Sequence, residues 1–249
     1  NVTYNGNNNY TINTSSNVSV DVTRAIPIVV ASVNGSVVYG ENITVNGSVS
    51  GVAGIVDNGN VTVHVNGTIV GTVSVGADGN WVLVLNSING SAFTVGVGNY
   101  SVNVTYNGNN NYTTKDSSNV SVDVTRAIPI VVADVNDTVV YGENITVNGS
   151  VTGVTGSVSN GNVTIYINGT EVITIDVNLD GTFNFTVNST NIGNFSVGVG
   201  NYSVNVTYNG NNNYTSSDSD TVFVNITQAI PIVVADVNNT VIYGENITV

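Results

Sequence analysis

The chain lacks cysteine and methionine, and its 249 residues include only three prolines and three basic residues. Without cysteine there is no disulfide and no thiol chemistry, so the redox compartment cannot be inferred from the sequence. The net charge of −13 at pH 7 leaves nothing to neutralise phosphate groups, which excludes nucleic acid and an anionic membrane surface as partners. The longest apolar run, residues 25–31, is broken by Pro27 and is too short to cross a bilayer, so we predict no membrane insertion of this segment.

What the chain has is a long internal repeat. The segment AIPIVVA(S/D)VN begins at Ala25, Ala127 and Ala229, at intervals of 102 residues. Residues 25–126 align with residues 127–228 without a gap and are identical at 67 of 102 positions. The repeat predicts two whole domains, 25–126 and 127–228. We expect residues 1–24 to be the C-terminal strands of a preceding repeat and residues 229–249 the N-terminal strands of a following one.

Apolar and polar residues alternate through most of each repeat, which is typical of half-buried strands. In the second repeat one strand is expected after Pro129, and six more at residues 144–151, 162–167, 172–177, 182–187, 201–208 and 221–227. Asn168-Gly169 is a strong hairpin signal, and no window has helical spacing. About seven short strands per unit predict an all-β fold of tandem immunoglobulin-like sandwiches in a linear array.

Several motifs carry a resemblance to a known group of proteins. YGENITVNGSV, GNVTIYINGT, LDGTFNFTV and GVGNYSVNVTYNGNNNYT resemble the Ig-like tandem repeats of bacterial and archaeal surface proteins, most closely the Asn-rich adhesin-like proteins of methanogenic archaea. Gly200-Asn201-Tyr202 resembles the tyrosine corner of such folds. The resemblance implies a surface stalk, spacer or fibre, and it implies no catalytic or ligand residues.

The titratable residues do not form a catalytic pattern. The only histidine, His64, is expected on an outward face, and Tyr166 replaces it in the next repeat. The acidic residues are scattered over loops and outward faces, whereas acid–base catalysis needs groups held close together. We therefore predict that the chain is not an enzyme. An intramolecular Lys–Asn crosslink is also disfavoured, because Lys115 is the only lysine and Ser217 takes its place in the second repeat.

One loop matches the start of a calcium-binding pattern. Asp176, Asn178 and Asp180 give D-x-N-x-D-G, in which alternate oxygen ligands converge on one ion. The twelfth position, however, is Val187, and the first repeat keeps only Asp78. A tight turn explains the same residues, because Asn and Asp tolerate left-handed conformations. Both interpretations, the turn and the calcium site, stay open, and no other cofactor is expected.

Asn-x-Ser/Thr sequons are unusually frequent: there are 28, against about nine expected by chance for this composition. Residues i and i+2 of a strand share one face, so an outward face of Asn, Ser and Thr produces sequons without any glycan. That alternative does not explain why charged residues are so rare on these faces, whereas a glycan coat or close packing against neighbouring copies would remove the need for charge. We therefore predict N-linked glycans, with ten candidate acceptors: Asn42, Asn60, Asn66, Asn103, Asn111, Asn144, Asn162, Asn168, Asn205 and Asn213.

The sequence favours a structural segment of an extracellular cell-surface filament or adhesin stalk. The alternative is an Ig-like adhesion module whose loops bind carbohydrate or protein. Pocket-forming sites use aromatic surfaces, but here aromatic residues are mostly at inward strand positions. The joint at Val124–Pro129 has no glycine and is expected to be stiff. We expect neighbouring copies of the chain, or its own continuation, to complete the two partial repeats.

Overall fold

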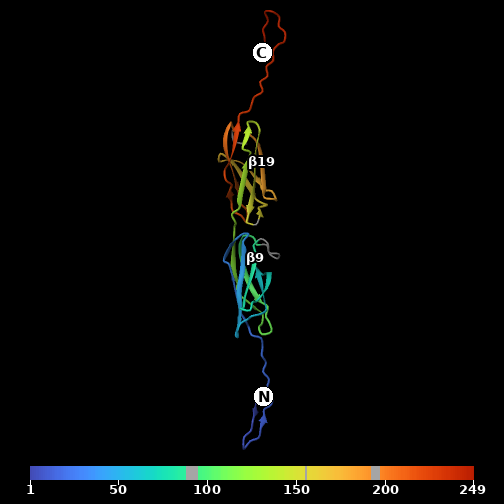
Figure 1. Cartoon of the computed structure of the whole chain (residues 1–249), viewed down its shortest axis with the longest axis vertical. Coiled ribbons are helices and arrows are strands. Elements are labelled where there is room, and N and C mark those ends of the chain that lie inside the picture. The colour runs from blue at the N-terminus through green and yellow to red at the C-terminus, as the bar shows by residue number, and fades with distance from the viewer. Residues whose placement is uncertain (88–94, 155, 192–196) are drawn as a thin grey trace. The chain divides into compact units, whose positions relative to one another are not determined.

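The computed structural model describes residues 1–87, 95–154, 156–191 and 197–249, and all the regular secondary structure in these ranges is β-strand. The chain forms two compact units. The first contains residues 1–37 and 41–124, and the second contains residues 38–40 and 125–249. Strand β9 (Asn80–Asn86) lies in the first unit and β19 (Thr182–Asn188) in the second (Figure 1).

The first unit contains two sheets. One consists of β3 (Ile28–Val33), β5 (Asn42–Gly51), β6 (Gly54–Ile55) and β9, with β5 pairing both β3 and β9. The other has the order β4 (Ser36–Val38), β12 (Val120–Thr125), β10 (Gly98–Tyr106), β7 (Asn60–Val65) and β8 (Thr68–Ser74), and β11 (Lys115–Asp116) also pairs β10.

The second unit repeats this topology. Its first sheet holds β13 (Ile130–Val135), β15 (Asn144–Gly153), β16 (Gly156–Ser157) and β19. Its second has the order β14 (Thr138–Val140), β22 (Val222–Thr227), β20 (Gly200–Tyr208), β17 (Asn162–Ile167) and β18 (Thr170–Asp176), with β21 (Ser217–Asp218) on β20. The predicted all-β fold of tandem Ig-like units is confirmed.

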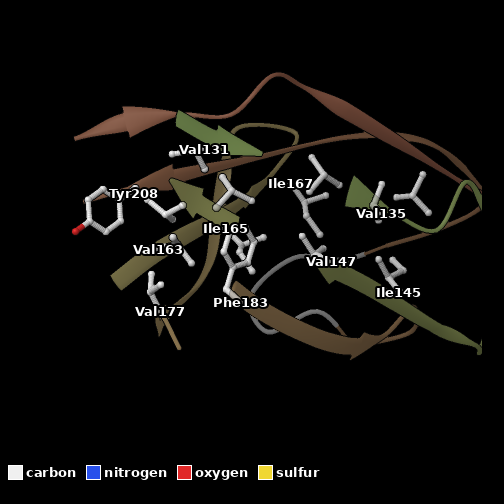
Figure 2. Close-up of a cluster of buried hydrophobic side chains, with 14 of the residues drawn as sticks. Val131, Val135, Ile145, Val147, Val163, Ile165, Ile167, Val177, Phe183 and Tyr208 are labelled. Carbon is white, nitrogen blue, oxygen red and sulfur yellow. The ribbon is translucent and has the colours of Figure 1, made fainter. Parts of the chain in front are cut away.

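Alternation of apolar and polar residues produces the core between the two sheets. In β17 the residues Val163, Ile165 and Ile167 are buried, and in β15 the residues Ile145 and Val147 are buried. Figure 2 shows these side chains together with those of the other strands of the second unit, in one continuous cluster. Burying a Val or Ile side chain stabilises the fold by about 1.5–3 kcal/mol, so this cluster supplies most of the free energy that drives folding of the unit.

The central strand of the first sheet contains a glycine for a packing reason. A Cβ on Gly149 would lie 2.1 Å from the Val132 carbonyl oxygen and 2.2 Å from the ring of Phe183. Gly47 has the same role in the first unit, against Val30 and Trp81. Each glycine therefore admits an aromatic ring from the neighbouring strand, and β15 pairs Gly149 directly with Phe183.

The two ends of the chain contain little regular structure. Residues 1–24 hold one short antiparallel pair, β1 (Thr3–Tyr4) with β2 (Asn13–Thr14), and residues 229–249 contain no strand. Val2, Tyr4, Ile230, Val233 and Ile247, which we expect neighbouring polypeptide to contact, are all exposed. That expectation stays a prediction.

Candidate functional site

The tyrosine corner predicted from sequence is present in both units. The Tyr202 hydroxyl donates to the Gly198 carbonyl oxygen at 3.1 Å, and the Tyr100 hydroxyl donates to the Gly96 carbonyl oxygen at 3.0 Å. Each bond joins the beginning of β10 or β20 to the loop before that strand. The motif stabilises the turn between strands, which is the role it has in other Ig-like folds.

A second pair of tyrosines is buried at the other end of the same strands. The Tyr106 and Tyr208 hydroxyls donate to the carbonyl oxygens of Asn58 and Asn160 at 3.0 and 2.9 Å. Burial raises the pKa of both phenols above the usual 10.0. With the pKa raised, both phenols keep their protons at neutral pH, and each hydroxyl donates the bond that holds the strand end to Asn58 or Asn160.

The only histidine lies in a small polar cluster on β7, β10 and β11. The Thr105 hydroxyl donates to an Asp116 carboxylate oxygen at 2.6 Å and lies 3.3 Å from Nε2 of His64. In the second unit Thr207 keeps the bond to Asp218 at 2.6 Å, but Tyr166 replaces the histidine. The repeated element is therefore the Thr–Asp bond, which ties a short strand to β10 and to β20.

The predicted calcium loop is a hydrogen-bonded turn in the structure. An Asp180 carboxylate oxygen accepts from the Thr182 backbone N–H at 3.0 Å and from its hydroxyl at 2.6 Å. The Asn178 side chain also donates to the Thr182 hydroxyl at 3.0 Å. Gly181 has φ of +82°, which favours glycine at this position. The bonds from Thr182 hold the pKa of Asp180 below its usual value.

The first unit keeps this turn with different side chains. Asp78 accepts from the Asn80 backbone N–H at 3.0 Å and from its side-chain amide at 2.8 Å, and these bonds lower the pKa of Asp78. The described residues contain no group of three or more His, Asp or Glu side chains that could hold a metal ion. The hydrogen bonds that Asp180 accepts belong to the turn, and the calcium site at Asp176, Asn178 and Asp180 stays a prediction.

An open surface hollow of about 530 Å³ lies beside this turn in the first unit, lined in part by Asn46, Asp78, Asn80 and Trp81. The Trp81 side chain is only 4% exposed, so its ring offers no stacking surface to a ligand. Its Nε1 is buried without a hydrogen-bond partner. The hollow therefore lacks the aromatic wall that small-molecule sites use.

The ten candidate glycan acceptors occupy five equivalent positions in each unit, and they differ in burial and in hydrogen bonding. Asn66 and Asn168 have φ of +46° and stand in the hairpin turns. Their side-chain oxygens accept from the backbone N–H of Ser101 and Ser203, each at 2.9 Å. The side chain thus fixes the turn to a neighbouring strand.

In two further pairs of sequons, a threonine of the sequon is hydrogen-bonded or largely buried. Asn103 and Asn205 are half-buried on the central strands β10 and β20, and their sequon threonines donate to aspartates as described above. Asn60 is exposed and Asn162 is half-buried. The threonine after Asn162, Thr164, is 5% exposed and hydrogen-bonded to Thr174 at 2.8 Å.

The pair in the Asn-rich loop, Asn111 and Asn213, differs in burial between the two units. Asn111 is exposed and Asn213 is half-buried. The backbone oxygens of both accept from an alanine of the same unit: Ala25 for Asn111, at 2.9 Å, and Ala127 for Asn213, at 3.0 Å. This contact connects residues that are far apart in the sequence.

The last pair, Asn42 and Asn144, begins the central strands β5 and β15. Both residues are exposed. Each side-chain oxygen accepts from an asparagine on the paired strand, Asn86 at 3.3 Å and Asn188 at 3.5 Å. The side-chain nitrogens of Asn42 and Asn144 donate no hydrogen bond within the described ranges. From the sequence, this pair and Asn103/Asn205 are the outward positions shared by both units where glycans are expected, and the structure leaves Asn42 and Asn144 exposed but Asn103 and Asn205 half-buried.

Comparison with known proteins fits this architecture. The profile of the bacterial Ig-like domain (group 3) matches residues 30–125 and 132–227, so the chain belongs to this family. The two matches lie within the two repeats expected from the sequence. None of the curated protein sequences matches the chain. The described residues contain no helix that is long and apolar enough to cross a membrane.

Solved structures that match the chain share little sequence with it. A tetra-tandem repeat in the extending region of a large adhesion protein is 16% identical with a TM-score of 0.47, over 82% of this chain and 50% of that one. A Salmonella alpha-2-macroglobulin mutant is 10% identical with a TM-score of 0.34, over 84% and 16%. Dimeric latent PorU from Porphyromonas gingivalis is 15% identical with a TM-score of 0.31, over 86% and 21%. The chain spans half or less of each of these structures.

Proposed function

We propose that the chain is a non-catalytic structural segment of an extracellular cell-surface filament or adhesin stalk. The observation that carries this proposal is the recurrence of one unit with the same structural bonds. Four hydrogen-bonded features occur in both copies with nearly equal distances. They are the tyrosine corner, the bond from the buried tyrosine hydroxyl, the Thr–Asp bond and the turn closed by Asp78 or Asp180. Residues that maintain the fold are kept, whereas the only histidine and the only lysine are not.

The surface chemistry supports the same role. Charged residues make up only 8% of the chain, and the outward strand positions are mostly Asn, Ser and Thr. Such a surface offers hydrogen bonds all along the unit but no cluster of charges that would select a charged ligand. A repeated spacer needs only to be folded and soluble, so it places no demand on any single surface residue.

A ligand-binding module is the main alternative, and the hollow beside Trp81 is its strongest support. In the second unit Phe183 and Thr182 replace Trp81 and Asn80, so the lining is not repeated. A site that recognises the same ligand in each unit would need the same lining. The structural role therefore fits the two copies better than the binding role does.

Labelling of intact cells of the source organism tests the location. A gold-conjugated antibody against residues 127–228 should decorate the outside of unbroken cells along projecting structures seen by electron microscopy. Antibody against a cytoplasmic protein, which labels broken cells alone, serves as the control. Labelling by the repeat antibody only after the cells are broken would contradict the proposal.

A further inference from the structure

Within each unit, the sequon asparagines differ in the hydrogen bonds that their side chains already make. An N-linked glycan is bulky and must project from the surface, and it occupies the side-chain nitrogen of the asparagine. A glycan replaces one of the two amide hydrogens, so a half-buried side chain whose nitrogen and oxygen both hold the backbone must either make room for the sugar or give up those bonds, and each net hydrogen bond is worth about 0.5–1.5 kcal/mol. Side-chain contacts therefore separate structural asparagines from available ones.

Asn34 and Asn136 are the clearest structural sequons. The Asn34 side-chain nitrogen donates to the Asn42 carbonyl oxygen at 3.2 Å, and its oxygen accepts from the Thr44 backbone N–H at 2.9 Å. Asn136 makes the same two bonds in the second unit, at 3.1 and 2.9 Å. Both residues are half-buried, with both ends of the amide engaged. They supply the matched negative control for the available positions.

Asn42 and Asn144 have the opposite properties. They are exposed, they start a strand, and only their side-chain oxygens accept a bond, at 3.3 and 3.5 Å. The Thr44 hydroxyl, two residues on and on the same face, makes no hydrogen bond in the described part of the chain. Among the same described residues, the Thr146 hydroxyl bonds only to the Thr186 hydroxyl, at 3.3 Å.

We propose that Asn42 and Asn144 are acceptors of N-linked oligosaccharides on this chain. The side-chain nitrogen forms a bond to C1 of a lipid-diphosphate-linked oligosaccharide, and the bond from C1 to the phosphate oxygen breaks. The lipid diphosphate leaves with the bonding electrons, and the amide proton passes to a base of the oligosaccharyltransferase. This modification is independent of whether the chain serves as a stalk.

The position of the two residues gives the glycan a physical use. The outward face of β5 and β15 belongs to the central strand of its sheet, flanked by β3 and β9 or by β13 and β19. The flanking strands β3 and β13 expose Ile28, Val30, Ile130 and Val132, which are 51–67% exposed. Exposed apolar strand edges favour aggregation, and a hydrated glycan on the same sheet would oppose it without adding charge.

The first experiment uses the folded chain of 249 residues, an oligosaccharyltransferase and a lipid-diphosphate-linked oligosaccharide as donor. Mass spectrometry of the peptides should find the sugar on Asn42 and Asn144 and not on Asn34 or Asn136. Thr44→Val should abolish modification of Asn42 alone, whereas Thr44→Ser should retain it. Transfer to Asn34 and Asn136 as complete as that to Asn42 and Asn144, or no transfer to Asn42 and Asn144, would overturn the proposal.

The second experiment maps the same peptides from protein isolated from its source cells. We expect glycan-bearing peptides at Asn42 and Asn144 and unmodified peptides at Asn34 and Asn136. Native protein in which Asn42 and Asn144 are both unmodified would overturn the proposal even if the isolated enzyme modifies them. Surface labelling of intact cells is unaffected by that outcome, so failure of this proposal leaves the structural role to be tested separately.

Discussion

At the scale of single residues, the two units differ at the aromatic side chain that covers the central glycine. Trp81 fills this position in the first unit and Phe183 in the second. The indole N–H of Trp81 is buried with no acceptor, and such a donor costs about 1–3 kcal/mol. Phenylalanine carries no donor, so the second unit avoids this cost.

Trp81→Phe should therefore change stability little. The lost ring volume destabilises the core, and the removed donor offsets this, so we expect a change within about 1 kcal/mol, against about 3–5 kcal/mol for Trp81→Ala. Urea unfolding followed by far-ultraviolet circular dichroism measures both variants. A loss for Trp81→Phe as large as that for Trp81→Ala would show that the indole N–H has a partner in solution.

Tyr208→Phe tests the buried hydroxyl bond at the end of β20. Removing the donor to the Asn160 carbonyl should destabilise the second unit by about 1 kcal/mol. Tyr166→Phe removes a half-buried hydroxyl that makes no hydrogen bond to the described residues, so it is the control and should have a smaller effect. The single tryptophan lies in the first unit, so its fluorescence transition in urea should stay in place while the circular dichroism changes.

The two buried tyrosines, Tyr106 and Tyr208, should make the fold less stable at alkaline pH. Burial raises the pKa of Tyr106 and Tyr208 above 10.0, so the folded state binds their protons more tightly than the unfolded state does. This contribution is complete below about pH 10 and is lost as the pH rises through the raised pKa. Urea midpoints measured from pH 8 to pH 11 should fall less steeply in the Tyr106→Phe, Tyr208→Phe double variant than in the unchanged chain. Equal slopes would contradict the assignment.

At the scale of elements, local alternation was enough to predict the long strands. The expected strand at 162–167 has the observed bounds, and the expected strand at 144–151 continues to Gly153. The short strands were missed because two or three residues are too few to show alternation. Strand β14 also pairs in parallel with β22, 87 residues away, and no local pattern reports such pairing.

The candidate site shows the same limit. Sequons, the tyrosine corner and the turn between β18 and β19 are local motifs, so they could be recognised in the sequence. The sequence did not show that both ends of the Asn34 and Asn136 side-chain amides bond to the backbone, eight and ten residues further along the chain. They depend on how β5 and β15 pass the preceding loop, so only the folded structure separates these asparagines from Asn42 and Asn144.

Gly149→Ala tests the packing of β15. The new Cβ would meet the Val132 carbonyl oxygen at 2.1 Å and the Phe183 ring at 2.2 Å, which no side-chain rotation relieves on the backbone side. We expect a loss of about 3 kcal/mol or more in urea unfolding. Gly198→Ala, where a Cβ meets nothing within 4 Å, is the control and should be nearly neutral. Equal effects of the two substitutions would exclude the close approach.

Calcium binding is tested at the turn between β18 and β19. Because the Asp180 carboxylate is already engaged by Thr182, the turn interpretation predicts the same melting temperature in calcium and in chelator. An increase with calcium that is lost in Asp176→Asn would instead establish the metal site at Asp176, Asn178 and Asp180. Thermal unfolding by circular dichroism distinguishes the two interpretations.

At the scale of the whole molecule, the chain is a tandem pair of units from one family, each with its own core. We propose that these units are interchangeable structural segments, whose number sets the reach of the protein and whose surfaces make no specific contact with a ligand. The alternative adhesion module assigns a specific contact to each unit. Removing one whole unit separates the two ideas.

Deletion of residues 127–228 joins Arg126 to Ala229 and removes one full period without interrupting the repeat. The measurement is the length of the surface projections on intact cells, imaged by electron microscopy, together with the binding of the cells to their natural surface. A structural segment predicts projections shorter by one unit, still displayed, with binding retained. Projections of unchanged length, or binding lost in proportion to the unit removed, would contradict the account.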